Sequence, residues 1–420
     1  MQRVLLFCLG VWLSADVLAM DHKHKPGSSG SQLKQCQGVA TLPSIHCGQT
    51  PAPLLGEDGK AWFVFVQNGH IYVSQSVDEG KTFLPPVAVN TIPELIYSDG
   101  ENRPKIAQGQ QGEIYISWTQ KAEGKYAGHI RFSRSLDGGK TFTAPIMVND
   151  DLAPISHRFD SMVVDQRGDI SIAWIDKRDL AAAKKTNKPY AGAAIYYAVS
   201  KDQGRSFEPN KKLADHSCEC CRIAMDVDAY GRVIALWRHV YPTNIRDHAI
   251  AYLNDESNSA SPFPVRATND EWQVEGCPHH GPDLSVGRDN KIHLTWFTQG
   301  ARNKGLMYGR FDMETQLIER EHTLDIKGGS SRPQVVTSAG TVYTAWKRFN
   351  GTETELVVSR SIDNGDSWSA PEIIAETASG SDHPMFVTQG KEVSLSWHTL
   401  AEGYRILPVL TSNQHASHTH

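Results

Sequence analysis

The chain carries a repeated pattern of alternating apolar and polar positions that ends in a large aromatic residue. In most copies a glycine or asparagine stands six residues before the aromatic, as in Gly112 to Trp118 and Gly168 to Trp174. Alternation after a turn residue predicts a β-strand, because successive side chains of a strand point to opposite faces. The aromatic positions are Phe65, Trp118, Trp174, Trp237, Trp296, Trp346 and Trp397.

The spacing of these copies predicts the fold class. Consecutive aromatic positions lie 50 to 63 residues apart, which is typical of the blades of a β-propeller. We therefore expect an all-β, seven-bladed β-propeller over residues 36–412, with six blades as the alternative. The last copy has room for only three strands, so we expect the segment 37–43 to supply a fourth and close the ring.

A second motif follows four of these copies. The octamers 76–83, 135–142, 200–207 and 361–368 read Ser-x-Asp-x-Gly-x-(Thr or Ser)-aromatic. They resemble the Asp-box hairpin of the sialidase (neuraminidase) superfamily, whose members are propellers that generally have six blades. The resemblance implies that each Asp caps the amides of its own turn, at the periphery of a blade and away from any active site. The Asp-box residues would be Asp78, Asp137, Asp202 and Asp363.

The N-terminal sequence predicts export of the protein. Arg3 precedes an apolar run from Val4 to Leu13, and small residues before Met20 form a cleavage site. We expect a signal peptide at 1–19, a flexible linker at 20–35, a His-containing tail at 413–420, and a periplasmic or secreted protein. No later run approaches the ~18 apolar residues of a transmembrane segment.

Charge excludes one class of partner. The chain has 42 basic and 47 acidic residues, a net charge of -5, interspersed along its length. No basic stripe is present to neutralise a phosphate backbone, so we expect no nucleic-acid partner.

Six of the seven cysteines follow the predicted cleavage site. Disulfides are the default in an oxidising compartment, and Cys36 is expected to pair with Cys47. For the inner cysteines two interpretations stay open, disulfides with Cys277 or a metal site. In an extended chain Cys218 and Cys220 would share one side and Cys221 would point to the other.

Residues from different blades should meet at one mouth of the central channel. The innermost strand of each blade is predicted about 15 residues before each aromatic, and chemistry-bearing residues stand just before these strands. The candidate anion-binding residues are Arg103, Arg158, Arg222 and Arg332, and the candidate metal ligands are Cys218, Cys220, Cys221, His157, His279, His280 and His383.

Thiolate and imidazole ligands together suit Cu(I) or Zn(II). The leading hypothesis is an exported propeller that binds copper, or alternatively zinc, through Cys220, Cys221, His279 and His280. Cys218, His157 and His383 are the next candidates. The arginines would hold a small anion beside the metal by bidentate hydrogen bonds.

Two alternatives remain. In a sialidase-like glycoside hydrolase the arginines would bind the carboxylate of an acidic sugar, with Tyr404, Glu101 and Asp382 as proposed catalytic groups. In a non-catalytic interaction platform the inner cysteines would be structural disulfides. The arginines would then pair with Asp160, Asp226 and Asp382 in the inner strands.

Overall fold

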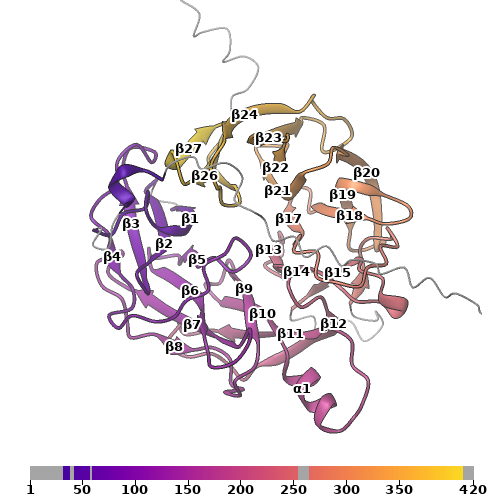
Figure 1. Ribbon diagram of the computed structural model, residues 1–420, viewed down its shortest axis with the longest axis horizontal. Helices are drawn as coiled ribbons and strands as arrows, with labels where there is room; N and C mark the ends of the chain where they lie inside the picture. Colours follow the sequence, from indigo (N-terminus) through magenta and orange to yellow (C-terminus); the bar gives the residue numbers. More distant parts are fainter. Residues whose placement is uncertain (1–31, 38–41, 57–58, 254–263, 410–420) are drawn as a thin grey trace, which may run out of the picture.

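The computed structural model describes residues 32–37, 42–56, 59–253 and 264–409. Within these residues the strands form seven antiparallel sheets around one axis (Figure 1). The all-β, seven-bladed prediction is confirmed, and the six-bladed alternative is wrong. The predicted signal peptide, most of the linker and the tail 413–420 lie outside the described residues.

Each blade is one sheet whose strands follow one another in chain order. The first three blades are β1 (Gln49–Leu55), β2 (Ala61–Gln67), β3 (His70–Ser76) and β4 (Val87–Ala88); β5 (Lys105–Gln108), β6 (Ile114–Lys121), β7 (Gly128–Ser135) and β8 (Ile146–Met147); β9 (His157–Val164), β10 (Ile170–Asp176), β11 (Ala193–Ser200) and β12 (Lys211–Ser217).

The other four blades repeat this plan, and the seventh has three strands. They are β13 (Ala224–Val227), β14 (Val233–Arg238), β15 (His248–Tyr252) and β16 (Val265–Arg266); β17 (Asp283–Val286), β18 (Ile292–Gln299), β19 (Lys304–Asp312) and β20 (Leu317–Asp325); β21 (Ser330–Ser338), β22 (Thr341–Phe349), β23 (Thr354–Ser361) and β24 (Glu372–Thr377); β25 (Met385–Gln389), β26 (Glu392–Thr399) and β27 (Gly403–Pro408).

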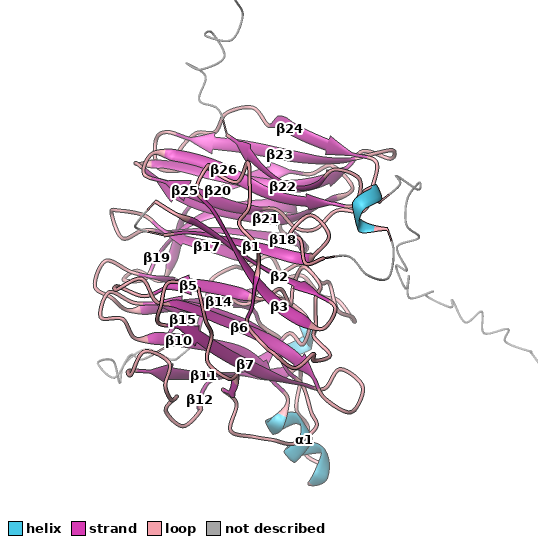
Figure 2. Ribbon diagram, turned by 90° about the vertical axis from the view of Figure 1, so that its left-hand side faces the viewer, coloured by secondary structure: helices cyan, strands magenta, loops and turns pink. Residues whose placement is uncertain are grey.

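Helices contribute little to the described chain. The α-helix α1 (Arg178–Lys185) contacts β11 at the edge of the third blade, outside the stack of sheets (Figure 2). Short 3-10 helices lie at η1 (Lys34–Cys36) and η2 (Pro242–Asn244). Among the described residues we find no helix with the length and apolar character needed to span a bilayer.

The first strand of each blade contacts the first strands of the two adjacent blades, so these seven strands form a ring around the axis. Several begin where the sequence predicted, for example at Lys105 after Pro104 and at Asp283 after Pro282, whereas β9 and β21 begin earlier and include the candidates His157, Arg158 and Arg332. The residues that precede them therefore share one mouth of the channel, called the mouth below.

The second strand of each blade carries the repeated aromatic residue, which is buried in all seven copies. Apolar side chains pack between adjacent blades, as where Trp62 of β2 and Trp118 of β6 belong to one cluster. Because a blade is covered on both sides, β2 is buried at every position. This explains why its sequence is almost continuously apolar rather than alternating.

The four octamers form the turns between the third and fourth strands of their blades. In the first, Asp78 accepts hydrogen bonds from the Thr82 amide and hydroxyl and from the Ser76 hydroxyl. These bonds lower the pKa of Asp78 to about 2. Because neighbouring strands are antiparallel, these turns lie at the opposite end of the blades from the mouth.

The predicted closing strand is not present in the described part of the segment 37–43. Gln37, Leu42 and Pro43 lie outside any strand, and residues 38–41 are not among the described residues. The seventh sheet accordingly has three strands in the described chain.

The chain ends are joined by other contacts. The predicted disulfide between Cys36 and Cys47 is confirmed. Beside it, the backbone carbonyl of His46 lies 3.0 Å from Nε2 of His398. The ring nitrogen Nδ1 of His46 accepts a hydrogen bond from the backbone amide of Tyr404 at 3.3 Å. The N-terminal segment is thereby held against β26 and β27 of the last blade.

Candidate functional site

Three thiols meet in the loop between β12 and β13. The Sγ atom of Cys218 lies 3.7 Å from that of Cys220 and 3.9 Å from that of Cys221, and the latter two are 4.0 Å apart. All three are buried and none is in a disulfide. We call these atoms the sulfur triangle. Its edges match the separation of about 3.8 Å that two sulfurs have in a tetrahedral site with ligand bonds of ~2.3 Å.

A turn creates the sulfur triangle. Residues 218–221 leave the strand β12 and form a tight turn instead of continuing in extended conformation. The expectation that Cys221 would point away from Cys218 and Cys220 is therefore wrong. The turn also buries the sulfurs in the apolar cluster that contains Trp237.

The sulfur triangle favours one negative charge. Hydrogen bonds from Cys220 and Cys221 lower the pKa of Cys218 well below its usual value, and Arg238 and Arg246 act in the same direction. Nη1 of Arg246 donates to Sγ of Cys218 at 3.5 Å. The hydrogen bonds of Cys220, above all the one with Cys218, raise the pKa of the Cys220 thiol. Two cationic side chains, those of Arg238 and Arg246, thus lie beside this sulfur centre.

A fourth thiol lies beside it. Cys277 is exposed, in the loop between β16 and β17. The neighbouring Cys220 thiol lowers the pKa of Cys277 to about 7. The predicted disulfides between Cys277 and the inner cysteines are not present.

A pocket of about 470 Å³ adjoins the sulfur centre at the mouth. Cys220 and Cys277 line it, together with apolar surfaces from Tyr126 and Phe159. Polar side chains complete its wall: Asp99, Glu101, Asn102, Ser156, Arg158, Lys177, Glu219, His279, Arg332 and His383.

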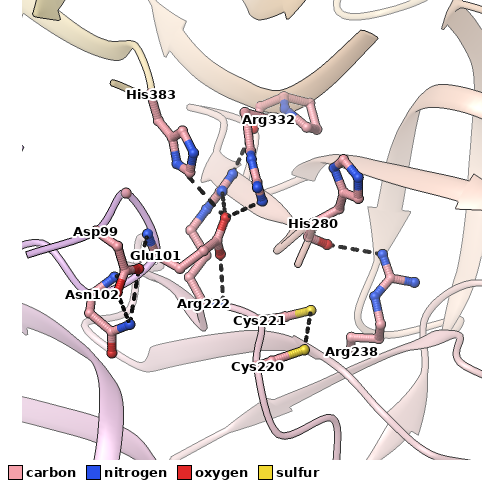
Figure 3. A network of polar contacts seen from close by, with 12 residues as sticks. Asp99, Glu101, Asn102, Cys220, Cys221, Arg222, Arg238, His280, Arg332 and His383 are labelled. Carbon is pink, nitrogen blue, oxygen red and sulfur yellow. Dashed lines mark hydrogen bonds and ion pairs between the residues drawn. The ribbon is translucent and has the colours of Figure 1, made fainter. Parts of the chain in front are cut away.

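Glu101 is the centre of the polar network at the mouth (Figure 3). Its Oε1 atom lies 2.7 Å from Nη1 of Arg332 and 3.3 Å from Nη1 of Arg222, and its Oε2 accepts the Arg222 amide at 2.9 Å. Burial opposes ionisation of Glu101, but the two guanidinium groups bring its pKa below the usual value. Two of the predicted anion-binding arginines therefore share one protein carboxylate, which offsets only one of their two positive charges.

A third arginine is also occupied. Nη2 of Arg103 contacts Oδ1 of Asp382 at 3.0 Å and the carbonyl of His383 at 3.1 Å. The structure thus contains an ion pair between an arginine and Asp382, as the interaction-platform alternative predicted. Asp160 instead accepts from the hydroxyls of Ser117 and Thr119.

Asp226 accepts backbone amides from Val227 and Val286. Asp160 and Asp226 are two of the three carboxylates that the interaction-platform alternative expected to pair with the arginines. The structure gives both of them uncharged donors.

Arg158 is held differently. Its guanidinium carbon lies 3.9 Å from the ring centre of Tyr97, and its nearest carboxylate, on Asp99, is 4.0 Å away. Its buried Nε atom has no hydrogen-bond partner. Of the four arginines, Arg158 is the one without a close ion pair.

The histidines do not join the sulfurs. Among the described residues, the one group of three or more ligand atoms within 4.8 Å of one another consists of Cys218, Cys220 and Cys221. The His280 ring stacks on Phe297 with centres 4.2 Å apart. Burial, with Arg332 and Arg238 nearby, lowers the pKa of His280 to about 3.

The other three histidines have separate environments. His157 is buried and its Nδ1 lies 2.9 Å from the carbonyl of Gly128. Nδ1 of His383 lies 3.8 Å from Oε1 of Glu101. His279 is exposed at the pocket wall. The predicted ligand set of Cys220, Cys221, His279 and His280 is thus reduced to its two cysteines, to which Cys218 is added.

The proposed glycosidase groups are not assembled as a catalytic set. Tyr404 packs its ring on Phe63 and Phe83 in the core between the first and last blades. The carboxylate of Glu101 contacts arginines, and that of Asp382 contacts Arg103. No contact between Tyr404 and Glu101 is found in the described chain.

Sequence analysis missed three basic residues near the mouth. Arg238 donates to the carbonyl of His280 at 3.0 Å, and Lys347 donates to the carbonyl of Ser381 at 2.8 Å. Both directly follow a repeated tryptophan, which is the signal that could have identified them. Arg246, which contacts Cys218, lies in a loop and carries no comparable signal.

Comparisons with known proteins agree with this fold. No protein-family model and no curated protein matches the sequence. An ulvan lyase of the polysaccharide lyase family PL25, solved bound to -[GlcA(1-4)Rha3S]-, is similar in structure with a TM-score of 0.53 and 11% identity over 88% of this chain and 92% of that chain. The polysaccharide lyase Uly1 has a TM-score of 0.51 and 8% identity over 90% and 95% of the two chains.

A sialidase is also similar, the Hadza microbial sialidase Hz136, with a TM-score of 0.48 and 10% identity over 82% of this chain and 74% of that chain. At such identities the similarity concerns the fold, since a propeller supports many activities. The class of this protein is a seven-bladed β-propeller, similar in fold to these two polysaccharide lyases.

Proposed function

We propose that the chain binds one soft metal ion, copper in its Cu(I) state, through Cys218, Cys220 and Cys221. The observation that carries this proposal is the sulfur triangle, whose edges of 3.7 to 4.0 Å leave room for an ion and are too long for a disulfide. Three unpaired thiols in a chain that has a disulfide elsewhere favour a role for the free sulfurs.

The ligand set favours Cu(I) over Zn(II). Three thiolates at ~2.3 Å in a plane would be separated by about 4.0 Å, close to the observed edges. Structural zinc needs a fourth ligand, and Cys277 lies outside the group of mutually close sulfurs. Three thiolates and Cu(I) carry a net charge of -2, which Arg238 and Arg246 offset.

The proposal also includes a bound small anion and a location of the protein outside the cytoplasm. A small anion in the pocket would be bound by Arg158 and Arg332, because these two arginines line the pocket and Arg103 and Arg222 do not. The disulfide between Cys36 and Cys47 supports a periplasmic or secreted location, where such bonds persist.

A competition titration tests the metal site. Purified, reduced protein is titrated anaerobically with Cu(I) against a chromogenic Cu(I) chelator, and bound metals are counted by mass spectrometry. We expect one equivalent of Cu(I), and loss of affinity by more than about 100-fold when Cys218, Cys220 and Cys221 are all replaced by serine.

The matched control is His279→Ala combined with His280→Ala, which should leave the Cu(I) affinity nearly unchanged. Absence of binding, or equal binding by the triple serine variant, would overturn the metal proposal. Stoichiometric zinc with no copper would keep the site and change the metal.

A further inference from the structure

We propose that Cys277 is the exchange ligand through which the metal enters and leaves the sulfur triangle. This inference rests on the proposed function, and it assigns to Cys277 a transient contact rather than a permanent place among the ligands. The donor it fits is a Cu(I) complex of a small thiol.

The positions of the four sulfurs define a route. Cys218 and Cys221 are 1% and 2% exposed and do not line the pocket. Cys220 belongs to the sulfur triangle and also lines the pocket. Cys277 lines the same pocket as Cys220 and is exposed. A soft ion arriving in the pocket therefore meets Cys277, then Cys220, then the two buried sulfurs.

The loop that carries Cys277 is loosely packed. A side chain placed at Gly276 would meet no atom within 4 Å, and residues 275–277 are all exposed. Cys277 belongs to the loop before the fifth blade, whereas the other three precede the fourth. A sulfur on a separate, exposed loop can approach and withdraw without distorting the turn that holds the triangle.

The exchange steps balance without any change of oxidation state. The Cys277 thiol loses a proton to solvent and forms a bond to Cu(I), and one donor thiolate leaves and takes up a proton. Cys220 then displaces the second donor thiolate in the same way. Finally the Cys218 thiolate binds the ion, the Cys221 thiol loses a proton to solvent and also binds it, and the Cys277 sulfur leaves and takes up a proton. Copper stays Cu(I) throughout.

Stopped-flow kinetics test this role. Reduced protein is mixed anaerobically with the Cu(I)–glutathione complex, and uptake is followed by thiolate-to-copper absorption in the ultraviolet. We expect Cys277→Ser to slow both uptake and release to a chelator by at least about tenfold, with the equilibrium affinity nearly unchanged. Cys277→His should restore part of the rate, because imidazole is also a copper ligand.

Glu275→Gln, on the same exposed loop, is the matched control and should keep the wild-type rate. Unchanged rates in Cys277→Ser would overturn the exchange role alone. A loss of affinity as large as that of Cys220→Ser would also overturn it, by making Cys277 a permanent ligand. Failure of the wild-type protein to bind Cu(I) would overturn both proposals together.

Discussion

Nη1 of Arg332 lies 2.7 Å from Oε1 of Glu101, although the two residues are 231 positions apart in the sequence. Glu101 precedes the second blade, Arg332 lies in the first strand of the sixth, and Arg222, its other partner, precedes the fourth. One buried carboxylate therefore connects three blades across the mouth. These arginines stabilise the ring before they can bind any ligand.

We predict that Glu101→Gln destabilises the protein by about 3–5 kcal/mol, because it leaves two half-buried guanidinium groups without their counter-charge. The measurement is urea unfolding at pH 7. The pKa of Glu101 is lowered in the folded protein, so its contribution is present above the usual glutamate value of 4.5 and is lost as the pH falls further.

The exposed Glu392→Gln serves as control and should change stability by less than about 0.5 kcal/mol. Equal stabilities of the two variants would show that the network around Glu101 is not what holds the blades at the mouth.

The carboxyl group of Asp283, at the axis, should change the stability of the protein with pH in the opposite direction to that of Glu101. Asp283, at the start of β17, is half-buried, and loss of hydration raises its pKa to about 6 from the usual 3.8. A raised carboxyl pKa means that ionisation costs stability above pH 6, and that this cost disappears as the pH falls toward 3.8.

We therefore expect Asp283→Asn to stabilise the protein at pH 8 by about 2–3 kcal/mol and to have no such effect near pH 4. The amide oxygen can still accept the hydrogen bond from the Val335 amide. Unfolding curves of both proteins across this pH range, with Glu392→Gln as control, are the measurement. A pH-independent difference would contradict the assignment.

Two adjacent glycines in the octamer 135–142 allow the stability cost of backbone strain to be measured apart from the cost of a clash between blades. Gly138 and Gly139 both have positive φ, 69° and 75°, but only Gly139 is close to another blade, where an added Cβ would lie 2.5 Å from the ring of Trp62. We expect Gly139→Ala to cost about 1–3 kcal/mol more than Gly138→Ala. Thermal unfolding of the pair tests this, and equal losses would indicate that the turn does not contact the preceding blade as described.

Hydrolysis of acidic sugars is the activity that the alternative hydrolase hypothesis predicts. We expect no hydrolysis of a fluorogenic sialoside, because Tyr404 is buried in the core and has no contact with Glu101. Turnover by the purified protein that is lost in Arg222→Ala would contradict this expectation and would favour the hydrolase hypothesis.

The number of blades could be predicted because the evidence for it is local and repeated. Each blade needs a turn residue, a buried second strand and an inner strand at a similar spacing, and these demands leave the same pattern seven times. The closing strand had no such repeat to support it. The pairing of Cys36 with Cys47, by contrast, needed only proximity in sequence and an oxidising setting.

By itself the sequence determined that cysteines, histidines and arginines from distant blades converge at one mouth. Only the tertiary structure decided which of them are partners. The turn at 218–221 brings Cys221 to Cys218, stacking on Phe297 keeps His280 from the sulfurs, and Glu101 occupies Arg222 and Arg332. The physical reason is that a strand pattern depends on a residue's own neighbours in the chain. A side chain's partner at the axis depends instead on distances across the ring, which exist only after the blades have closed.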